Sequence, residues 1–231
     1  MLVGAFIVPH PPLIIPEVGH GEEKLIPETV KSYKKIADAI RRLKPETIVI
    51  TTPHSIMYQD YFHISPGTEA EGSFARFGAP QVSFRVAYDS ELSEQIAEFC
   101  EEDNIPAGFL GERDPQLDHA FLIPVYFIQD LIGSTKFVRI GLSGLSADMH
   151  FRFGEEIRKA ADRLGRRIVL VASGDCSHVL KADGPYGYQP EGPEFDRRLI
   201  SYIQQDYLEG LLDFDEDFCN KAAECGLRSF I

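Results

Sequence analysis

Three histidines stand at positions where side chains could act together. His10, His54 and His178 each come a few residues after a short apolar run that is rich in β-branched residues. Such runs are typical of buried strands. In open α/β sheets, ligands bind in the crevice at the carboxyl ends of the strands. We therefore expect these three histidines to share one site.

The residue types around this crevice suit a metal ion. A mononuclear Fe(II) site that uses O2 needs two imidazoles, one carboxylate and open positions. His10 and His54 are the strongest imidazole candidates, because each is flanked by proline at a strand end. Asp175 and Glu224 are candidates for the carboxylate, and Cys225 is a soft alternative ligand. The structural alternatives are loop histidines bonded to backbone and an exposed glutamate at a helix end.

Two further histidines could move protons. His178 follows a Ser-Gly-Asp turn and could be a metal ligand or a general acid/base, because imidazole titrates near neutral pH. His119 directly follows Asp118, so it is a candidate second proton carrier or a donor to a substrate. The sequence predicts a proton-transfer role near the proposed metal.

Other catalytic chemistries are weakly supported. Ser173 and Ser177 flank the same turn, but the G-x-S-x-G nucleophile elbow of many serine hydrolases is absent. The segment from Gly141 to Ser146 matches neither the dinucleotide-binding nor the P-loop pattern. We therefore favour metal-assisted chemistry over acyl or phosphoryl transfer.

Strands and helices alternate along most of the chain, which predicts an α/β fold with a mainly parallel central sheet flanked by helices. Pro66 to Pro80 has no periodicity and is interpreted as a long loop, a candidate lid over the site. Ser90 and Ser146 are expected to cap helices. The expected strands are 1–8, 47–51, 61–64, 82–86, 136–141 and 167–171, and the expected helices are 26–43, 90–102, 146–163 and 193–207.

Composition limits the partners. The chain has 231 residues and a formal net charge of -13, which disfavours nucleic acid and anionic membranes. No stretch of 18 apolar residues predicts a membrane span. The four cysteines form no C-x-x-C pair, and no secretion signal is recognisable, so we expect reduced thiols and a cytoplasmic protein.

Five motifs, in order along the chain, resemble the class III extradiol ring-cleavage dioxygenases of the LigB type. The segment Ser-Gly-Asp-Cys-Ser-His is the most specific of them. The pattern around Gly226 is most similar to the branch that includes Memo-like proteins and is associated with radical SAM proteins. The motifs are Val8–Pro12, Thr52–Ser55, Asp118–His119, Ser173–His178 and Glu224–Arg228.

The resemblance implies ferrous iron as the cofactor and a catechol-type aromatic and O2 as substrates. It implies His10, His54 and Glu224 as metal ligands, with Cys225 competing because Memo proteins have a cysteine at the corresponding place. It also implies His178 as the acid/base and His119 as a substrate contact. Ser173 and Asp175, in the same motif as His178, are further substrate-binding candidates.

The resemblance further implies one catalytic domain over residues 1–231, without its C-terminal continuation, and is compatible with a homo-oligomer. The alternative function is a Memo-like module that binds a metal or a partner and has no ring-cleavage activity. An iron site by itself does not identify the organic substrate.

Overall fold

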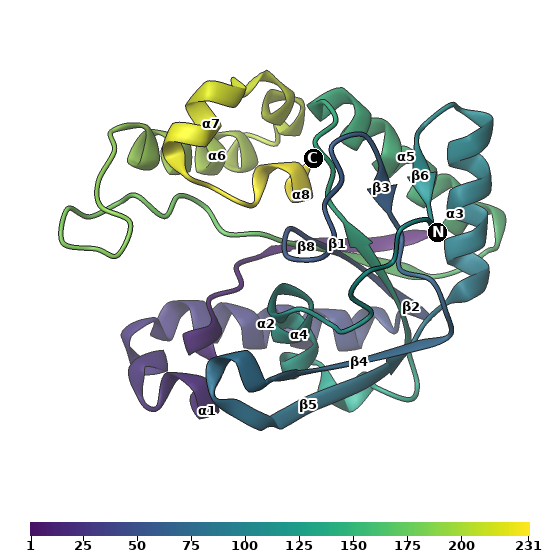
Figure 1. Ribbon diagram of the computed structural model, residues 1–231, viewed down its shortest axis with the longest axis horizontal. Helices are drawn as coiled ribbons and strands as arrows, with labels where there is room; N and C mark the ends of the chain where they lie inside the picture. The colour runs from purple at the N-terminus through teal and green to yellow at the C-terminus, as the bar shows by residue number, and fades with distance from the viewer.

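The computed structural model describes residues 1–231 and has a four-stranded parallel sheet at its centre (Figure 1). The strand order is β1-β8-β2-β7, so strands from both ends of the chain are neighbours. This confirms the expected α/β fold with a mainly parallel central sheet. The strands are β1 (Leu2–Val8), β2 (Thr47–Thr52), β7 (Lys136–Gly141) and β8 (Ile168–Ser173).

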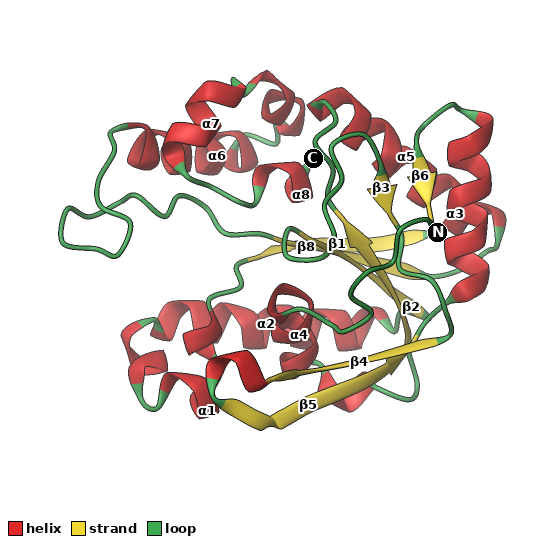
Figure 2. Ribbon diagram, in the orientation of Figure 1, coloured by secondary structure: helices red, strands yellow, loops and turns green.

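Helices cover both faces of this sheet (Figure 2). The pair on the first face is α2 (Pro27–Leu43) and α4 (His119–Phe127), and the pair on the second is α3 (Ser90–Glu102) and α5 (Ala147–Arg163). Successive side chains of a strand point to opposite faces. In β2, Ile48 and Ile50 therefore join the first core and Val49 joins the second. Burial on both faces explains why these strands read as continuous apolar runs.

The segment Pro66 to Pro80, expected to be a loop, is mostly a β-hairpin arm. β4 (Glu69–Phe74) pairs antiparallel with β5 (Ala79–Ala87), and the short helix η3 (Ala75–Phe77) forms the turn between them. The loop expectation was wrong because β4 lacks an alternating apolar pattern. A tertiary contact holds it instead: a Cβ on Gly72 would lie 2.4 Å from the carbonyl oxygen of Leu117, so only glycine allows this approach.

The C-terminal residues form a small helical lobe above the sheet, drawn in yellow-green and yellow in Figure 1. It has its own apolar core, which includes Phe195, Leu199 and Leu211. Its elements are α6 (Glu191–Gln204), η5 (Leu208–Asp213), α7 (Glu216–Ala222) and α8 (Leu227–Phe230). The remaining short elements are η1 (Pro12–Ile14), α1 (Pro16–Gly19), η2 (Glu22–Leu25), β3 (Phe62–His63), β6 (Ala107–Gly108) and η4 (Gln129–Leu131).

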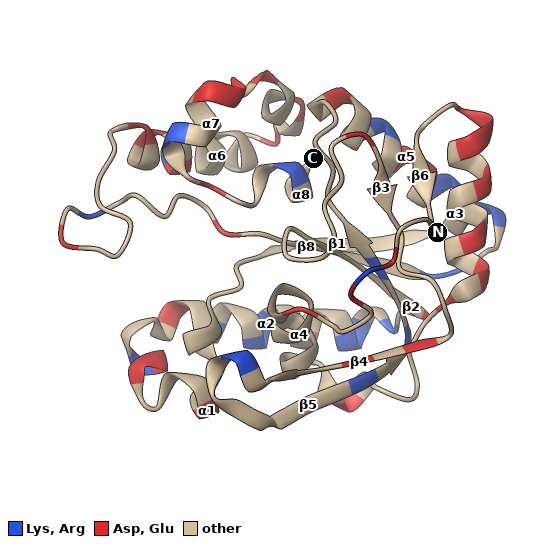
Figure 3. Cartoon of the chain, in the orientation of Figure 1, with Lys and Arg blue, Asp and Glu red and all other residues tan.

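Acidic side chains gather on α3 and α7, whereas Lys and Arg are scattered (Figure 3). This view shows no broad basic face of the kind that binds phosphate backbones. No helix of the structure is both long and apolar enough to cross a lipid bilayer.

Of the two expected helix caps, one is correct and the other is wrong by one residue. Ser146 caps α5 as expected, accepting a hydrogen bond from the amide of Met149. The cap of α3, however, is Asp89 rather than Ser90, and its carboxylate accepts from the amide of Leu92. Asp89 also accepts hydrogen bonds from Thr47 and Arg166. These bonds join the start of α3 to the sheet.

We expect Asp89→Asn to lower the free energy of unfolding by about 2–3 kcal/mol. The substitution breaks a buried ion pair with Arg166, and it can place the NH2 group of asparagine against the donors of Thr47 and Arg166. Urea denaturation would measure the change. The matched control is Glu91→Gln, which removes the other carboxylate paired with Arg166. Glu91 is 64% exposed, so its loss should change stability by less than about 1 kcal/mol. Equal losses in the two variants would contradict a structural role special to Asp89.

Candidate active site

The order of the strands brings the expected histidines together. β1, β8 and β2 are parallel neighbours, so the loops that follow them leave the same edge of the sheet. His10 follows β1, His54 follows β2, and their Nε2 atoms lie 3.1 Å apart. His178, after β8, is joined to this pair through Asp175, which lies 3.7 Å from His10 and 3.4 Å from His178.

His119 completes a cluster of three imidazoles. It is the first residue of α4, whose N-terminus is capped by the carboxylate of Asp118. The ring centroid of His119 lies 4.3 Å from that of His54 and 5.5 Å from that of His10. Ring nitrogens of the three histidines lie within 4.8 Å of one another, close enough to hold a metal ion together.

Ser173 fixes the tautomer of His10. Its hydroxyl donates to the carbonyl oxygen of Ala120 over 2.7 Å and lies 3.1 Å from His10 Nδ1. A hydroxyl has only one proton to donate, so it must accept from Nδ1–H of His10. Nε2 of neutral His10 is therefore unprotonated and faces His54. Ser173 is fully buried and lies behind His10.

Asp175 links the metal-binding candidates to His178. One carboxylate oxygen accepts from the backbone amide of His10 over 2.7 Å, and the other faces the side chains of His10 and His178. Burial by itself favours the protonated acid. Hydrogen bonds from His178 and His10 outweigh it and hold the pKa of Asp175 below its ordinary value. Asp175 is thus an anion at neutral pH.

Two adjacent residues, Glu224 and Cys225, occupy different environments. The sulfur of Cys225 lies 3.5 Å from His10 Nε2, and a second set of converging donors consists of His10, Asp175 and Cys225. The carboxylate of Glu224 instead accepts from the amides of Gly226 and Leu227 at the start of α8, over 2.8 and 2.6 Å. Glu224 belongs to neither set of converging donors.

The protonation of the cluster suits metal binding. Burial lowers the pKa of His10 and of His119 to about 4, and burial also lowers the pKa of His54. These imidazoles are therefore neutral at pH 7, the form that binds metals. Burial raises the pKa of the Cys225 thiol to about 12, so a thiolate there needs a neighbouring cation.

The pKa of His178 is shifted in the opposite direction. Its hydrogen bond with Asp175 raises its pKa above the ordinary value, against the opposing effect of burial. Its Nδ1 lies 2.5 Å from the carbonyl oxygen of Ala223, which can only accept, so Nδ1 carries a proton. Nε2 of neutral His178 is the atom left to take up a proton beside Asp175.

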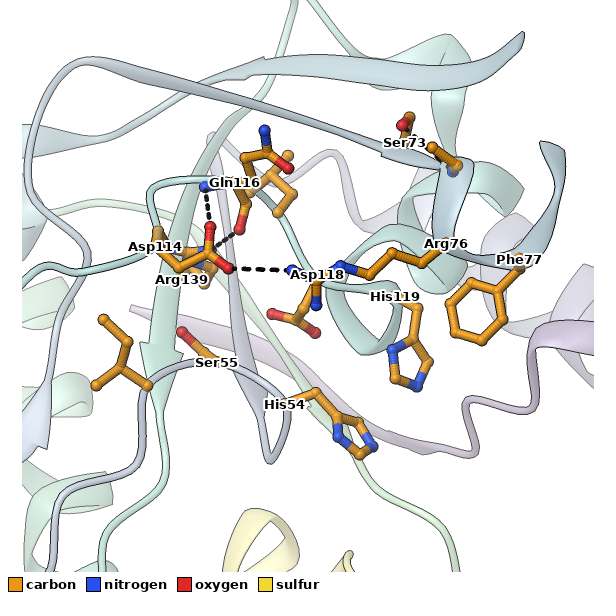
Figure 4. Close-up of a pocket in the computed structure, with 13 residues that line it drawn as sticks. His54, Ser55, Ser73, Arg76, Phe77, Asp114, Gln116, Asp118, His119 and Arg139 are labelled. Atoms are coloured by element: carbon orange, nitrogen blue, oxygen red, sulfur yellow. Dashed lines mark hydrogen bonds and ion pairs between the residues drawn. The ribbon is translucent and has the colours of Figure 1, made fainter. Parts of the chain in front are cut away.

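A pocket of about 380 Å³ opens beside this cluster (Figure 4). His54 and His119 form one wall of the pocket. Arg76 and Phe77 come from the turn of the β4–β5 hairpin, and the Phe77 ring packs edge-on against His119 at a centroid distance of 5.1 Å. The volume is in the range of small-ligand sites. The hairpin expected to be a lid thus supplies a wall of the pocket.

Several residues of this site were not identified from the sequence. Arg76, Phe77 and Arg139 line the pocket, but no local motif marks them. Arg139 is almost fully buried and donates to Ser65 and to the carbonyl oxygens of Gln116 and Asp114. A buried arginine in the middle of an apolar strand was the one available signal, because such a charge needs partners.

Comparison with known proteins identifies the family. A profile described as the catalytic LigB subunit of aromatic ring-opening dioxygenase matches residues 4–231. Protein CA_C1420 of Clostridium acetobutylicum is 40% identical over 235 residues, covering 99% of this chain and 50% of the relative. The chain thus spans about half the length of that relative.

More distant relatives have informative names. The 3,4-dihydroxyphenylacetate 2,3-dioxygenase of Escherichia coli is 20% identical over 205 residues, covering 84% of this chain and 72% of the enzyme. A MEMO1 family protein of Pyrococcus furiosus is 27% identical over 177 residues, covering 74% of this chain and 55% of that protein. The solved structure of protein JW3007 from Escherichia coli K12 has the same fold, with a TM-score of 0.52 at 18% identity over 87% of this chain and 80% of that one.

Proposed function

The chain belongs to the LigB family of catalytic subunits of aromatic ring-opening dioxygenases, and from this premise we propose that it binds ferrous iron and opens a catechol-type ring with O2. Its small-molecule partners would be the aromatic diol and O2. Cytoplasmic location and assembly into a homo-oligomer remain part of this proposal. All four cysteines are free, as a reducing compartment requires.

The observation that carries the proposal is the pairing of His10 and His54. Two nitrogens that bind one ion at about 2.0–2.1 Å lie roughly 3 Å apart, which fits the 3.1 Å between the Nε2 atoms. The bond from His10 Nδ1 to Ser173 directs the lone pair of His10 Nε2 toward His54. A carboxylate or carbonyl behind a ligating histidine is the usual arrangement, and here a hydroxyl has that role.

We propose Cys225, which converges with His10 and Asp175, as a further metal ligand in place of Glu224. Cys225 Sγ lies 3.5 Å from His10 Nε2, a separation that two ligands of one ion can have. Glu224 already satisfies two amides of α8. Its role would be to hold the turn that presents Cys225.

Ferrous iron, when bound, would supply a Lewis acid and the positions at which the diol and O2 meet. His178 would take the proton of a substrate hydroxyl at Nε2, because Nδ1–H is already donated to Ala223. The resulting imidazolium would be stabilised by Asp175, 3.4 Å away. The same proton could then be returned to the reacting oxygen. His119, in the wall between cluster and pocket, would contact the substrate.

Anaerobic binding tests the first half of this proposal. Protein loaded with Fe(II) in the absence of O2 should change its iron spectrum when catechols are added, because a diol bound there would change the surroundings of the iron. A spectrum that no member of a broad catechol panel changes would contradict the proposal.

We expect Ser173→Ala to weaken metal binding about 10- to 100-fold, the usual effect of losing the group behind a ligating histidine. Without the hydroxyl, His10 can adopt the other tautomer and turn its lone pair away. Competition with a chromophoric chelator would measure the affinity. Ser177→Ala is the matched control, because Ser177 is also buried and donates to a backbone carbonyl, that of Ala222. Equal affinities in the two variants would contradict the orienting role.

A second candidate function is a Memo-like metal-binding module without ring cleavage. Cys225 favours it, because a thiolate in place of a carboxylate also suits copper and zinc. The similarity to the Pyrococcus furiosus MEMO1 family protein agrees with this alternative. Protein that binds iron yet takes up no O2 with any catechol would support it over the dioxygenase.

A further inference from the structure

We propose that Tyr186 is a positioning residue for His178: its ring covers the imidazole and holds Nε2 of His178 toward Asp175. The inference rests on the proposed function, because it concerns the acid/base of that same site. It gives a role to residues 180–188, an extended loop that follows His178 and that we call the arm.

The arm begins and ends at one place. In Figure 1 it is the light green loop at the far left of the view. Leu180 and Tyr188 form an antiparallel bridge at its base, and the amide of Gln189 donates to the carbonyl oxygen of Val179. Because His178 directly precedes this base, both ends of the arm are fixed beside the imidazole.

Two tight turns fold the arm and place Tyr186 near its base. The amide of Gly184 donates to the carbonyl oxygen of Lys181, and the amide of Gly187 donates to that of Gly184. Gly187 has a φ of 75°, in the left-handed region that glycine adopts without strain, and nothing lies within 4 Å of a Cβ built on it. The backbone of the turn, and not packing, therefore requires glycine at this position.

The ring of Tyr186 packs against the imidazole of His178. The two ring centroids lie 5.3 Å apart, and the ring planes are inclined by 50°. Tyr186 is 67% exposed and belongs to none of the three apolar cores. Its replacement should therefore leave the stability of the fold nearly unchanged, so an effect on the imidazole can be measured separately.

The other contacts of His178 leave the tilt of its ring weakly held. Nδ1–H donates to the carbonyl oxygen of Ala223 over 2.5 Å, and Nε2 lies 3.4 Å from the carboxylate of Asp175. Hydrogen bonds at ring nitrogens act near the plane of the imidazole, and the second of these is long. The Tyr186 ring, inclined to that plane, limits the tilt.

The orientation of Nε2 matters because this atom would take the substrate proton. A general base must lie within hydrogen-bond reach of the proton that it removes. Misplacement of a reacting group by about 1 Å can lower a rate about 10²-fold. Tyr186 would therefore act on turnover through His178, without contacting the reacting atoms itself.

The first test measures chemical access to His178 in the metal-free protein, so it does not depend on the reaction. Diethyl pyrocarbonate modifies imidazole nitrogens, and mass spectrometry of peptides would give the rate at His178 alone. Tyr186→Ala should raise this rate severalfold, whereas Tyr186→Phe, which keeps the ring, should leave it unchanged. Tyr188→Ala is the matched control, because Tyr188 is 52% exposed on the same arm and Tyr186 is the aromatic residue paired with His178.

The second test measures turnover of a catechol by the Fe(II)-loaded protein. Tyr186→Ala should lower kcat about 10-fold, less than the cost of losing the acid/base itself, and should change KM less than about twofold. Tyr186→Phe should restore kcat. In protein that already carries His178→Ala, adding Tyr186→Ala should change the residual kcat less than about twofold, because the ring acts only through His178.

The two tests separate this inference from the proposed function. An unchanged modification rate in Tyr186→Ala, or an equal rise in Tyr186→Phe or Tyr188→Ala, would overturn the inference even if ring cleavage is observed. A further fall of kcat of about 10-fold in the double variant would also overturn it, because Tyr186 would then act independently of His178. Faster modification in Tyr186→Ala alone would support the inference even if no catechol is cleaved, a result that would contradict only the dioxygenase reaction.

Discussion

Replacing His178 with alanine is expected to lower the rate of ring cleavage about 10²- to 10⁴-fold, the usual cost of a lost general acid/base. The metal content should stay close to that of the unchanged protein, because His178 belongs to neither set of converging donors. Its Nε2 faces Asp175 instead. Turnover of a catechol, together with iron analysis of the same preparation, would measure both quantities.

The control for this variant is His150→Ala. His150 is buried, whereas His178 is 30% exposed, and the His150 ring bonds to the Ser146 carbonyl and to the amide of Ser143, away from the cluster. Its replacement should affect stability more than turnover per bound iron. Parallel loss of iron and activity in His178→Ala would make His178 a ligand and would contradict its assignment as the acid/base.

Replacing Cys225 with alanine is expected to lower the affinity for iron by more than about 100-fold. Loss of a direct ligand should exceed the 10- to 100-fold effect of losing a group behind one. The sulfur of Cys225 lies next to His10 Nε2, whereas the carboxylate of the preceding Glu224 is turned to the amides of α8. Metal titration against a chelator would give the affinity.

Glu224→Gln is the matched comparison, because it keeps an oxygen that can accept from Gly226 and Leu227. It should change the iron affinity less than about threefold, below the 10- to 100-fold effect of losing a group behind a ligand. The reverse ranking, with iron lost from Glu224→Gln and kept by Cys225→Ala, would restore the carboxylate as the third ligand.

The meeting of His10, His54 and His178 could be predicted from the sequence, because it depends only on where three strands end. The apolar runs before His10, His54 and His178 identify strands. The loops that follow parallel strands all begin at the same edge of the sheet. The strand order β1-β8-β2 then makes the three loops neighbours. Local patterns sufficed here because burial on both faces gives these strands a strong apolar signal.

The choice between Glu224 and Cys225 depends on geometry that local patterns do not encode. The two residues are consecutive in a turn, so one side chain pointing inward directs the other away. The turn begins at Ala223, which has a φ of 50° in the left-handed region at the end of α7. An alanine in this conformation has no distinctive sequence signal. The sequence therefore does not choose between Glu224 and Cys225 as the ligand.

The pocket could not be predicted because it is made by distant segments. Arg76 and Phe77 come from the turn of the β4–β5 hairpin, and they meet Asp114 and His119 only when β4 packs against the segment around Leu117. The sequence of β4 predicts a loop, because apolar and polar residues do not alternate in it. Similarly, Asp89 outcompetes Ser90 as a cap because Arg166, distant in sequence, pairs with it.

The most direct test of the dioxygenase function is O2 uptake by protein loaded with Fe(II) and saturated with 3,4-dihydroxyphenylacetate or 4-ethylcatechol. We predict that O2 is consumed in proportion to the ring opened, that a yellow hydroxymuconic-type product forms, and that mass spectrometry finds both atoms of labelled O2 in it. Protein that holds iron at His10 and His54, binds these catechols and yet consumes no O2 would contradict the dioxygenase function.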